Sequence, residues 1–182
     1  MTLAYVVTEG KSDVEILKKL LPEKIIREAQ LVVGGGKYSA QSLAGTILAV
    51  KSLPVALVID ADTQDELAIR EKSELLHQLL HQASPGIPFE VFTAVPELEA
   101  VFFHDRSVLK KITGISLNDL EWQVAKHHPK EFLIKNLGKE PLFVEKILSK
   151  LDDEMIGALQ QHPLIERLTE FLGSIVLLAS NV

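Results

Sequence analysis

The feature that most constrains the fold is a regular alternation of short apolar runs with longer segments of helical periodicity over the first 95 residues. The apolar runs are rich in β-branched residues and predict four strands, at residues 3–8, 29–33, 55–59 and 89–95. The intervening segments predict helices, at residues 12–21, 39–52 and 66–82. Strands that alternate with helices form right-handed crossovers, so we expect an α/β fold with a mostly parallel four-stranded sheet flanked by helices.

The pattern changes after Pro96, where strand signals end. Residues 97–103, 107–112, 117–127, 141–151 and 164–178 have helical periodicity. We therefore predict two parts: an α/β domain of residues 1–104 and a helical C-terminal subdomain of residues 105–182, which together suit a chain of 182 residues.

Composition excludes several classes of site and of partner. The chain has no cysteine, which rules out disulfides, thiolate zinc sites and cysteine nucleophiles. Its first residues lack an export signal, and the apolar run at 175–179 is too short to span a bilayer, so we expect a cytoplasmic protein without membrane contact. A net charge of −6 argues against a protein that coats nucleic acid by itself, so such contact should be local, metal-bridged or assisted by a partner.

Acidic residues follow two of the predicted strands. Glu9 comes directly after the first strand, and Asp60 and Asp62 end the third. Ligands of an open parallel sheet bind outside the carboxyl ends of its strands, and the alternation of a strand would send Asp60 and Asp62 to one side. Three carboxylates can then share a hard cation such as Mg²⁺ or Mn²⁺. The alternative is ordinary turn chemistry for Asp60 and Asp62.

The motifs resemble a known superfamily. Glu9-Gly10-Lys11-Ser12-Asp13 after an apolar strand, with Asp60-Ala61-Asp62 after a later strand, is similar to the Toprim signature of topoisomerases, primases and related nucleases. The turn Gly34-Gly35-Gly36-Lys37 and the segment Pro96-Glu97-Leu98-Glu99-Ala100 are most similar to the Toprim domain of the overcoming-lysogenization-defect (OLD) nucleases and of small stand-alone relatives. The resemblance covers residues 3–103 and implies a Toprim-like fold, with the helical part as an appendage.

The resemblance also implies roles for individual carboxylates. Glu9 would be a metal ligand and general acid/base, and Asp60 and Asp62 would be metal ligands, which makes these three the catalytic set. Asp13 would help to hold a second metal, although it also suits the helix dipole as a first-turn acid. Glu97 is a further candidate ligand, with a helix-start acid after Pro96 as the alternative.

Phosphate contacts are predicted around the glycine turn. Lys11 and Lys37 are the nearest candidates for a catalytic lysine, and Gly35 and Gly36 would bring backbone amides near a phosphate, with an ordinary turn as the alternative. A further basic cluster, at residues 126–130, can touch phosphates or lie on an ordinary surface. These predictions name a phosphate-binding set of Lys11, Gly35, Gly36 and Lys37.

One departure from the OLD nucleases bears on function. Those proteins carry an ATPase module on the same chain, whereas this sequence has no Gly-x-x-x-x-Gly-Lys-Ser/Thr motif. We therefore expect a metal-dependent protein that cleaves phosphodiesters or transfers phosphoryl groups on nucleic acid, binds nucleic acid weakly alone, and works with an ATPase or another protein partner. The alternative is a non-catalytic Toprim-like regulatory or scaffolding module. A phosphotransfer domain with Asp60 as acceptor is disfavoured, because the acidic groups and lysine of such a pocket would lie elsewhere.

Overall fold

A computed structural model describes residues 2–83 and 86–180. Its sheet has the strand order β2-β1-β3-β4, and all three pairings are parallel. The strands are β1 (Ala4–Thr8), β2 (Ala29–Val33), β3 (Val55–Asp60) and β4 (Phe89–Ala94). The predicted α/β fold with a parallel four-stranded sheet is therefore confirmed.

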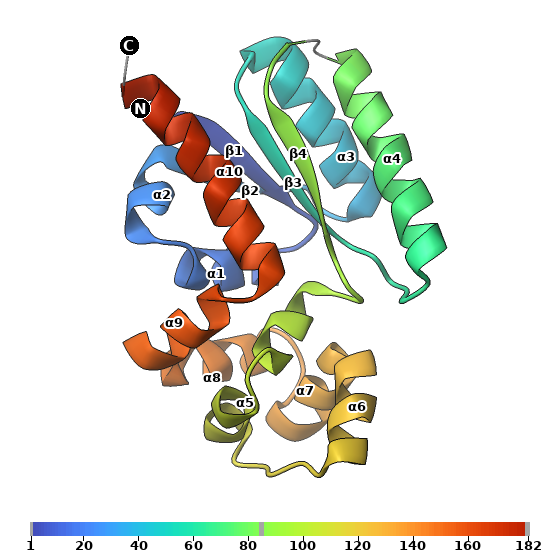
Figure 1. The fold of residues 1–182 in the computed structure, drawn as a ribbon, viewed down its shortest axis with the longest axis vertical. Coiled ribbons are helices and arrows are strands. Elements are labelled where there is room, and N and C mark those ends of the chain that lie inside the picture. The colour runs from blue at the N-terminus through green and yellow to red at the C-terminus, as the bar shows by residue number, and fades with distance from the viewer. Residues whose placement is uncertain (1, 84–85, 181–182) are drawn as a thin grey trace.

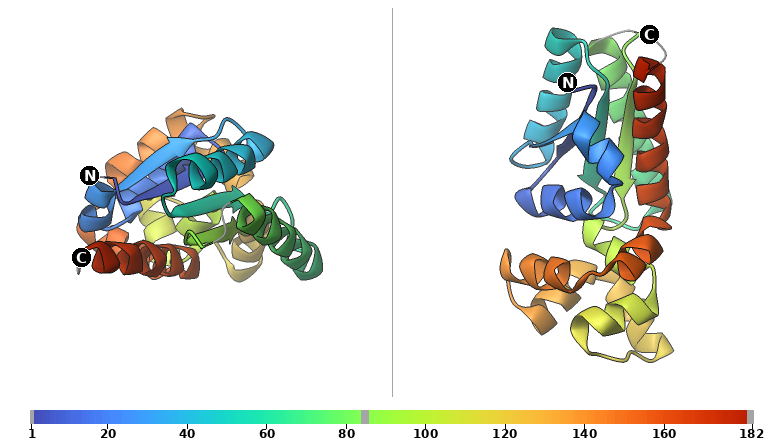
Figure 2. Two further views of the ribbon diagram at one scale, coloured as in Figure 1. Left: turned by 90° about the horizontal axis from the view of Figure 1, so that it is seen from above. Right: turned by 90° about the vertical axis from the view of Figure 1, so that its left-hand side faces the viewer.

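Helices cover both faces of the sheet (Figures 1 and 2). α1 (Lys11–Leu20) and α2 (Glu23–Glu28) connect β1 to β2, α3 (Lys37–Thr46) and the π-helical turn η1 (Ile47–Lys51) connect β2 to β3, and α4 (Glu66–Ala83) connects β3 to β4. Helix α2 was not predicted, because its six residues lie in the short interval between Pro22 and β2.

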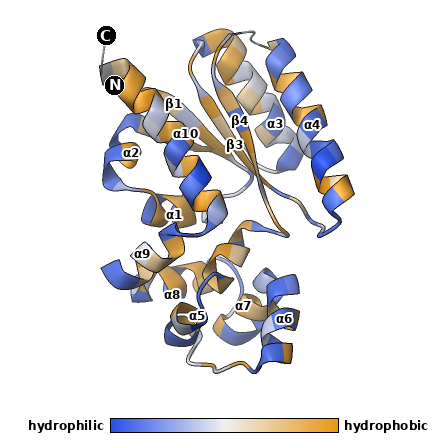
Figure 3. Cartoon of the chain, in the orientation of Figure 1, coloured by the Kyte–Doolittle hydropathy of each residue, from blue (hydrophilic) through white to orange (hydrophobic). Residues whose placement is uncertain are grey.

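The sequence of the central strands explains the two layers. Every residue of β1 is buried, as is every residue of β3 before Asp60, as expected for strands covered on both faces. Alternate side chains enter different cores: Val6 and Val58 pack towards α1 and α10, whereas Val7 and Leu57 pack towards α3 and α4. The strands are accordingly mostly orange in Figure 3, while the covering helices carry both colours.

The helical residues after Pro96 gather mainly at one end of the sheet (Figure 1). They form the 3-10 helix η2 (Leu98–Phe103), then α5 (Arg106–Thr113), α6 (Asp119–His127), α7 (Pro129–Leu137), α8 (Leu142–Lys150) and α9 (Asp153–Gln160). Helices α7 and α9 were not predicted. Local signals set several ends: the Asp105 carboxylate accepts from two N–H groups of the first turn of α5, and Gly114 ends that helix with φ 78°.

The last helix, α10 (Pro163–Ser180), turns back and packs against the sheet beside α2 and β4. Its residues share one apolar core with α1, β3 and the helices at the end of the sheet. The division into residues 1–104 and 105–182 stays a prediction, and α10, which falls in its second part, lies in the layer that covers the sheet. Within residues 2–83 and 86–180, no helix is long and apolar enough to cross a membrane.

Candidate metal centre

The topology brings the ends of β1 and β3 together. These strands are neighbours in the sheet, yet the chain leaves β1 towards β2 and leaves β3 towards β4, so their carboxyl ends flank the switch point of the strand order. Glu9 and Asp60 occupy that place. The backbone N–H of Asp60 donates to Oε1 of Glu9 at 2.9 Å, which fixes the Glu9 carboxylate against the end of β3.

Asp60 is the most perturbed acid of this region. Its Oδ1 accepts a hydrogen bond of 2.9 Å from the backbone N–H of Leu98. Burial, followed in order of size by the charges of Asp13, Glu99 and Glu9, raises the pKa of Asp60 to about 8, although the hydrogen bond from Leu98 opposes the rise. The charges of the other three acids therefore act on Asp60, and we call these four residues the carboxylate cluster: Glu9, Asp13, Asp60 and Glu99.

Asp13 has a structural task as well as a place in the carboxylate cluster. Its Oδ2 accepts from the N–H of Gly10 at 2.8 Å and so caps α1, in keeping with the first-turn alternative. Burial raises its pKa, and nearby Glu9 adds to the shift. The capping bond occupies one oxygen, so Asp13 can cap the helix and still face its acidic neighbours.

Glu99 was not predicted as a site residue. It lies in η2 with a relative exposure of 1%, and neither carboxylate oxygen has a hydrogen-bond partner among the described residues. Burial raises its pKa to about 7, although the nearby charge of Lys130 opposes the rise. The available signal was an acid inside an otherwise apolar segment, because Leu98, Val101 and Phe102 around it are all buried.

Lys130 belongs to the basic cluster at residues 126–130 that was predicted as a possible phosphate contact, but its pairing with buried acids was not predicted. Its Nζ lies 3.3 Å from Oε1 of Glu99 and 2.8 Å from Oε1 of Glu140. Burial alone would lower the pKa of Lys130, but these two carboxylates raise it overall, so its ammonium is held charged. Its backbone N–H also donates to Oε1 of Glu97 at 2.7 Å, which makes Glu97 an anchor for the start of α7.

Asp62 lies apart from the carboxylate cluster. β3 ends at Asp60, and Asp62 has φ 57°, so strand alternation does not set the direction of its side chain, contrary to our expectation. That side chain is 68% exposed and pairs with the ammonium of Lys37. Burial would lower the pKa of Lys37, but the bond with Asp62 raises it overall.

Lys72 lies beside Lys37, and its Nζ donates to the backbone carbonyl of Asp60 at 3.2 Å. Burial and the neighbouring Lys37 lower the pKa of Lys72.

The glycine turn faces the protein rather than an open site. The N–H groups of Gly35 and Gly36 both donate to the carbonyl oxygen of Glu9, at 3.1 and 2.9 Å. Their amides are therefore used within the fold, and the expected phosphate contact through them has no support in this arrangement. Lys11 begins α1 with an exposed side chain, so Lys37 is the member of the predicted phosphate-binding set that lies beside a predicted metal ligand.

The chemistry of the carboxylate cluster suits a hard cation. Its donors are oxygens, as Mg²⁺ and Mn²⁺ prefer, and the two oxygens of Glu99 are buried without a hydrogen-bond partner in the described chain. As the side chains stand, no three acidic, histidine or cysteine groups within residues 2–83 and 86–180 lie close enough to hold one ion. Assignment of Glu9, Asp13, Asp60, Asp62 and Glu97 as ligands therefore stays a prediction.

Comparison with known proteins places the fold. No protein-family model and no characterised protein sequence matches the chain. Among solved structures, it is similar to the C-terminal region of the OLD protein of Xanthomonas campestris pv. campestris, with a TM-score of 0.56 and 11% identity over 99% of this chain and 98% of that one. The C-terminal region of the Burkholderia pseudomallei OLD protein matches with a TM-score of 0.53 and 13% identity, over 96% and 99% of the two chains. This chain therefore has the Toprim fold of the C-terminal region of OLD proteins.

Proposed function

We propose that the chain is a Toprim-type protein that binds Mg²⁺ or Mn²⁺ at the carboxylate cluster and cleaves phosphodiester bonds of nucleic acid. The observation that carries the proposal is Glu99, a carboxylate with 1% exposure that lies beside Asp13 and Asp60, has no hydrogen-bond partner in the described chain and forms an ion pair with Lys130 at 3.3 Å. Several carboxylates buried together repel each other, and a divalent cation relieves that repulsion. The similarity to OLD C-terminal regions supports a role connected with nucleic acid.

The residues have separate tasks under this proposal. Glu9, Asp13, Asp60 and Glu99 would hold the cation, which when bound activates the attacking oxygen and neutralises charge on the phosphate. Glu9 is positioned by the N–H of Asp60 and would accept or return a proton at its carboxylate. Lys130, kept charged beside Glu99 and Glu140, would stabilise a developing negative charge on the substrate.

Lys37 and Lys72 would steer the substrate from the other side. Both lie beside the outer acid Asp62, whose side chain is exposed enough to meet solvent and metal. The net charge of −6 means that these lysines act locally, so binding by the isolated chain should be weak and salt-sensitive. An ATPase or another protein partner would then supply further contact with nucleic acid.

The test combines cleavage with metal binding. Plasmid and single-stranded DNA and RNA would be incubated with the protein in Mg²⁺ or Mn²⁺, alongside Asp60→Asn, Glu99→Gln and Lys130→Met. Glu23→Gln on the exposed face of α2 is the matched control. We expect cleavage that EDTA abolishes, a loss of about 100-fold or more in the three site variants, and unchanged activity in the control. Activity that persists in Asp60→Asn and Glu99→Gln would refute the proposal.

A second candidate function has one observation in its favour. Because no three candidate ligands gather around one point in the described chain, a non-catalytic scaffolding role is consistent with the resting arrangement. Titration calorimetry separates the two functions. Metal binding with cleavage supports the enzyme, whereas the absence of both, in a chain that still binds a partner, supports the scaffold.

A further inference from the structure

Among residues 2–83 and 86–180, the outer edge of β4 has backbone groups without a strand partner. β4 is the last strand of the order β2-β1-β3-β4, so within these residues only the edge towards β3 is paired. The register aligns Val55 with Phe89 and Asp60 with Ala94. Val55 N–H donates to the carbonyl of Pro88 at 3.2 Å and Ala61 N–H to that of Ala94 at 2.8 Å.

This register decides which residues face outward. In a parallel ladder a strand uses alternate residues for each neighbour, so the even-numbered residues of β4 bond to β3. The N–H and C=O groups of Phe89, Val91 and Thr93 therefore point away from β3, towards the open edge. A strand edge with unused donors and acceptors is a template for another extended chain.

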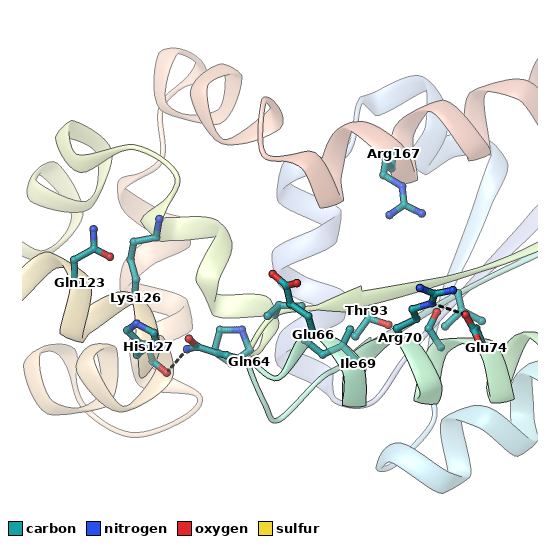
Figure 4. Close-up of a pocket in the computed structure, with 14 residues that line it drawn as sticks. Gln64, Glu66, Ile69, Arg70, Glu74, Thr93, Gln123, Lys126, His127 and Arg167 are labelled. Carbon is teal, nitrogen blue, oxygen red and sulfur yellow. Dashed lines mark hydrogen bonds and ion pairs between the residues drawn. The ribbon is translucent and has the colours of Figure 1, made fainter.

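A groove of about 760 Å³ runs along this edge. Val91, Thr93 and Val95 line it from the strand, Ile69 and Arg70 line it from α4, and Arg167 lines it from α10. Figure 4 shows Arg167 reaching towards the strand from one side and Arg70 with Glu74 from the other, with Lys126 and His127 of α6 closing one end. The edge is therefore recessed between two helical walls.

The position of the β4 edge between α4 and α10 favours a single extended segment as the bound partner. A second copy would bring its own α4 and α10 against the same two walls, whereas a single extended segment can enter between them. The six residues of β4 correspond to about 20 Å of strand, which sets the length of that segment. One hydrogen bond, from Gln64 Nε2 to the carbonyl of His127 at 3.2 Å, fixes the closed end to the loop after β3.

The charges that line the groove favour a bound segment with one acidic group at the end closed by Lys126 and His127. Arg70 pairs with Glu74 and Arg167 with Glu90, so these arginines are already compensated. Lys126 takes part in none of the ion pairs found among the described residues, and its side chain lies at the end towards which β4 runs. Glu66 also lines the groove, so a run of acids would be repelled while one acid beside Lys126 would be attracted.

We propose that the open edge of β4 binds an extended peptide segment of a partner protein, which adds to the sheet as a fifth strand and sets an acidic group beside Lys126. The segment has apolar or β-branched side chains that face Ile69 and Val91, and it carries no proline where its amides meet the edge. This binding is independent of metal and of cleavage.

The test uses two synthetic peptides of alternating threonine and valine, one with aspartate at its carboxyl end and one with aspartate at its amino end, for the two possible strand directions. Each is compared with a copy whose alternate amides are N-methylated. Binding is followed by fluorescence anisotropy and by amide hydrogen exchange of the full chain. We expect one peptide to bind and to slow exchange at Val91 and Thr93 by about tenfold or more, with little change at Phe92, which bonds to β3.

Two variants separate pairing from folding. Thr93→Pro removes an N–H that β3 does not use, and Thr93→Val keeps the backbone intact as its control. Proline should weaken peptide binding about tenfold or more while valine leaves it unchanged, and Lys126→Gln should weaken only the peptide with the correctly placed acid. Equal binding of the N-methylated copies, or no binding of either peptide near 1 mM, overturns the proposal. So does protection of Val91 and Thr93 that rises with protein concentration alone, because it would identify a second copy at the edge.

Discussion

The N–H of Asp60 donates to Oε1 of Glu9 across the boundary between β3 and β1, at 2.9 Å. Glu9 directly follows β1 and Asp60 is the last residue of β3, and these two strands are paired in parallel. The bond therefore fixes the carboxylate of Glu9 against the backbone of Asp60. This is the degree of preorganisation that a metal site requires from its scaffold.

The first prediction distinguishes Glu99 from Glu97. Glu97 anchors the N–H of Lys130, whereas the oxygens of Glu99 have no hydrogen-bond partner in the described residues. Glu99→Gln should therefore abolish most of the rise in melting temperature on adding Mg²⁺, while Glu97→Gln should keep that rise and lower stability by about 1 kcal/mol. Thermal unfolding measures both effects, without Mg²⁺ and at Mg²⁺ concentrations that increase in tenfold steps. Identical Mg²⁺ responses in the two variants would contradict the assignment.

The second prediction concerns the pH dependence of stability in the absence of metal. The pKa of Asp60 is about 8 in the folded chain against an ordinary value of 3.8, so the folded state holds a proton that the unfolded state has lost. Stability is then greatest below pH 4 as far as Asp60 is concerned, and it is lost as the pH rises towards 8. Asp60→Asn should remove this loss and be more stable than the parent at pH 8.5, by on the order of 2–4 kcal/mol. Denaturant unfolding in EDTA at pH 5 and pH 8.5 gives the comparison, and parallel pH profiles of the two proteins would rule the effect out.

The third prediction uses two glycines as a matched pair. A Cβ at Gly34 would overlap the backbone of Ala40 at the start of α3, so Gly34→Ala should destabilise the protein by about 2–4 kcal/mol and shift the turn that contacts Glu9. Gly157 lies inside α9 with open space around a Cβ, so Gly157→Ala should stabilise by about 0.5–1 kcal/mol. Chemical denaturation measures both, and a mild effect at Gly34 would show that the turn can move.

The fourth prediction concerns acid stability at the start of α10. Burial, with nearby His104 and Lys126, lowers the pKa of His162 to about 4, and its Nδ1 accepts from the N–H of Leu164 at 3.2 Å. The folded state therefore resists protonation, so stability present at pH 7 is lost as the pH falls from about 6.5 to 4. After allowance for its partial contact with solvent, His162 accounts for on the order of 1–2 kcal/mol of this loss. His162→Asn keeps an acceptor without titrating, and its stability should fall less between pH 7 and pH 4.5 than that of the parent. Equal losses would remove His162 as the cause.

Much of the sheet could be predicted because local pattern and global topology agree. The continuous apolar runs of β1 and β3 are what buried parallel strands require, and the strand-end rule placed Glu9 near Asp60. The direction of Asp62 could not be predicted, because it depends on a left-handed backbone conformation two residues beyond the strand. Helix α2 escaped for a different reason, since six residues are too few for periodicity to show.

Glu99, which was not predicted, and its pairing with Lys130 depend on packing between distant segments. Glu99 and Lys130 meet only because η2 and α7 pack together, and no spacing rule relates them. The hydrogen bonds from the Gly35 and Gly36 amides to Glu9 could not be predicted from the motif either. The same glycine-rich sequence can form a turn that binds phosphate or a turn that bonds to the end of a strand. Sequence therefore identified the strand-end carboxylates and left their counter-ion unassigned.

Lys130 links α7 to acids on two other segments: its N–H contacts Glu97, just before η2, and its ammonium lies between Glu99 of η2 and Glu140, which precedes α8. If a cation binds at the carboxylate cluster as proposed, it would neutralise Glu99, one of the two acids that hold this ammonium, and ion binding would then be thermodynamically linked to the packing of α7. The packing of α7 would then depend on whether the charge of Glu99 is neutralised. A graft of β1 and β3 with Glu9 and Asp60 onto another scaffold would leave out η2 and α7, and with them Glu99, Lys130 and this link.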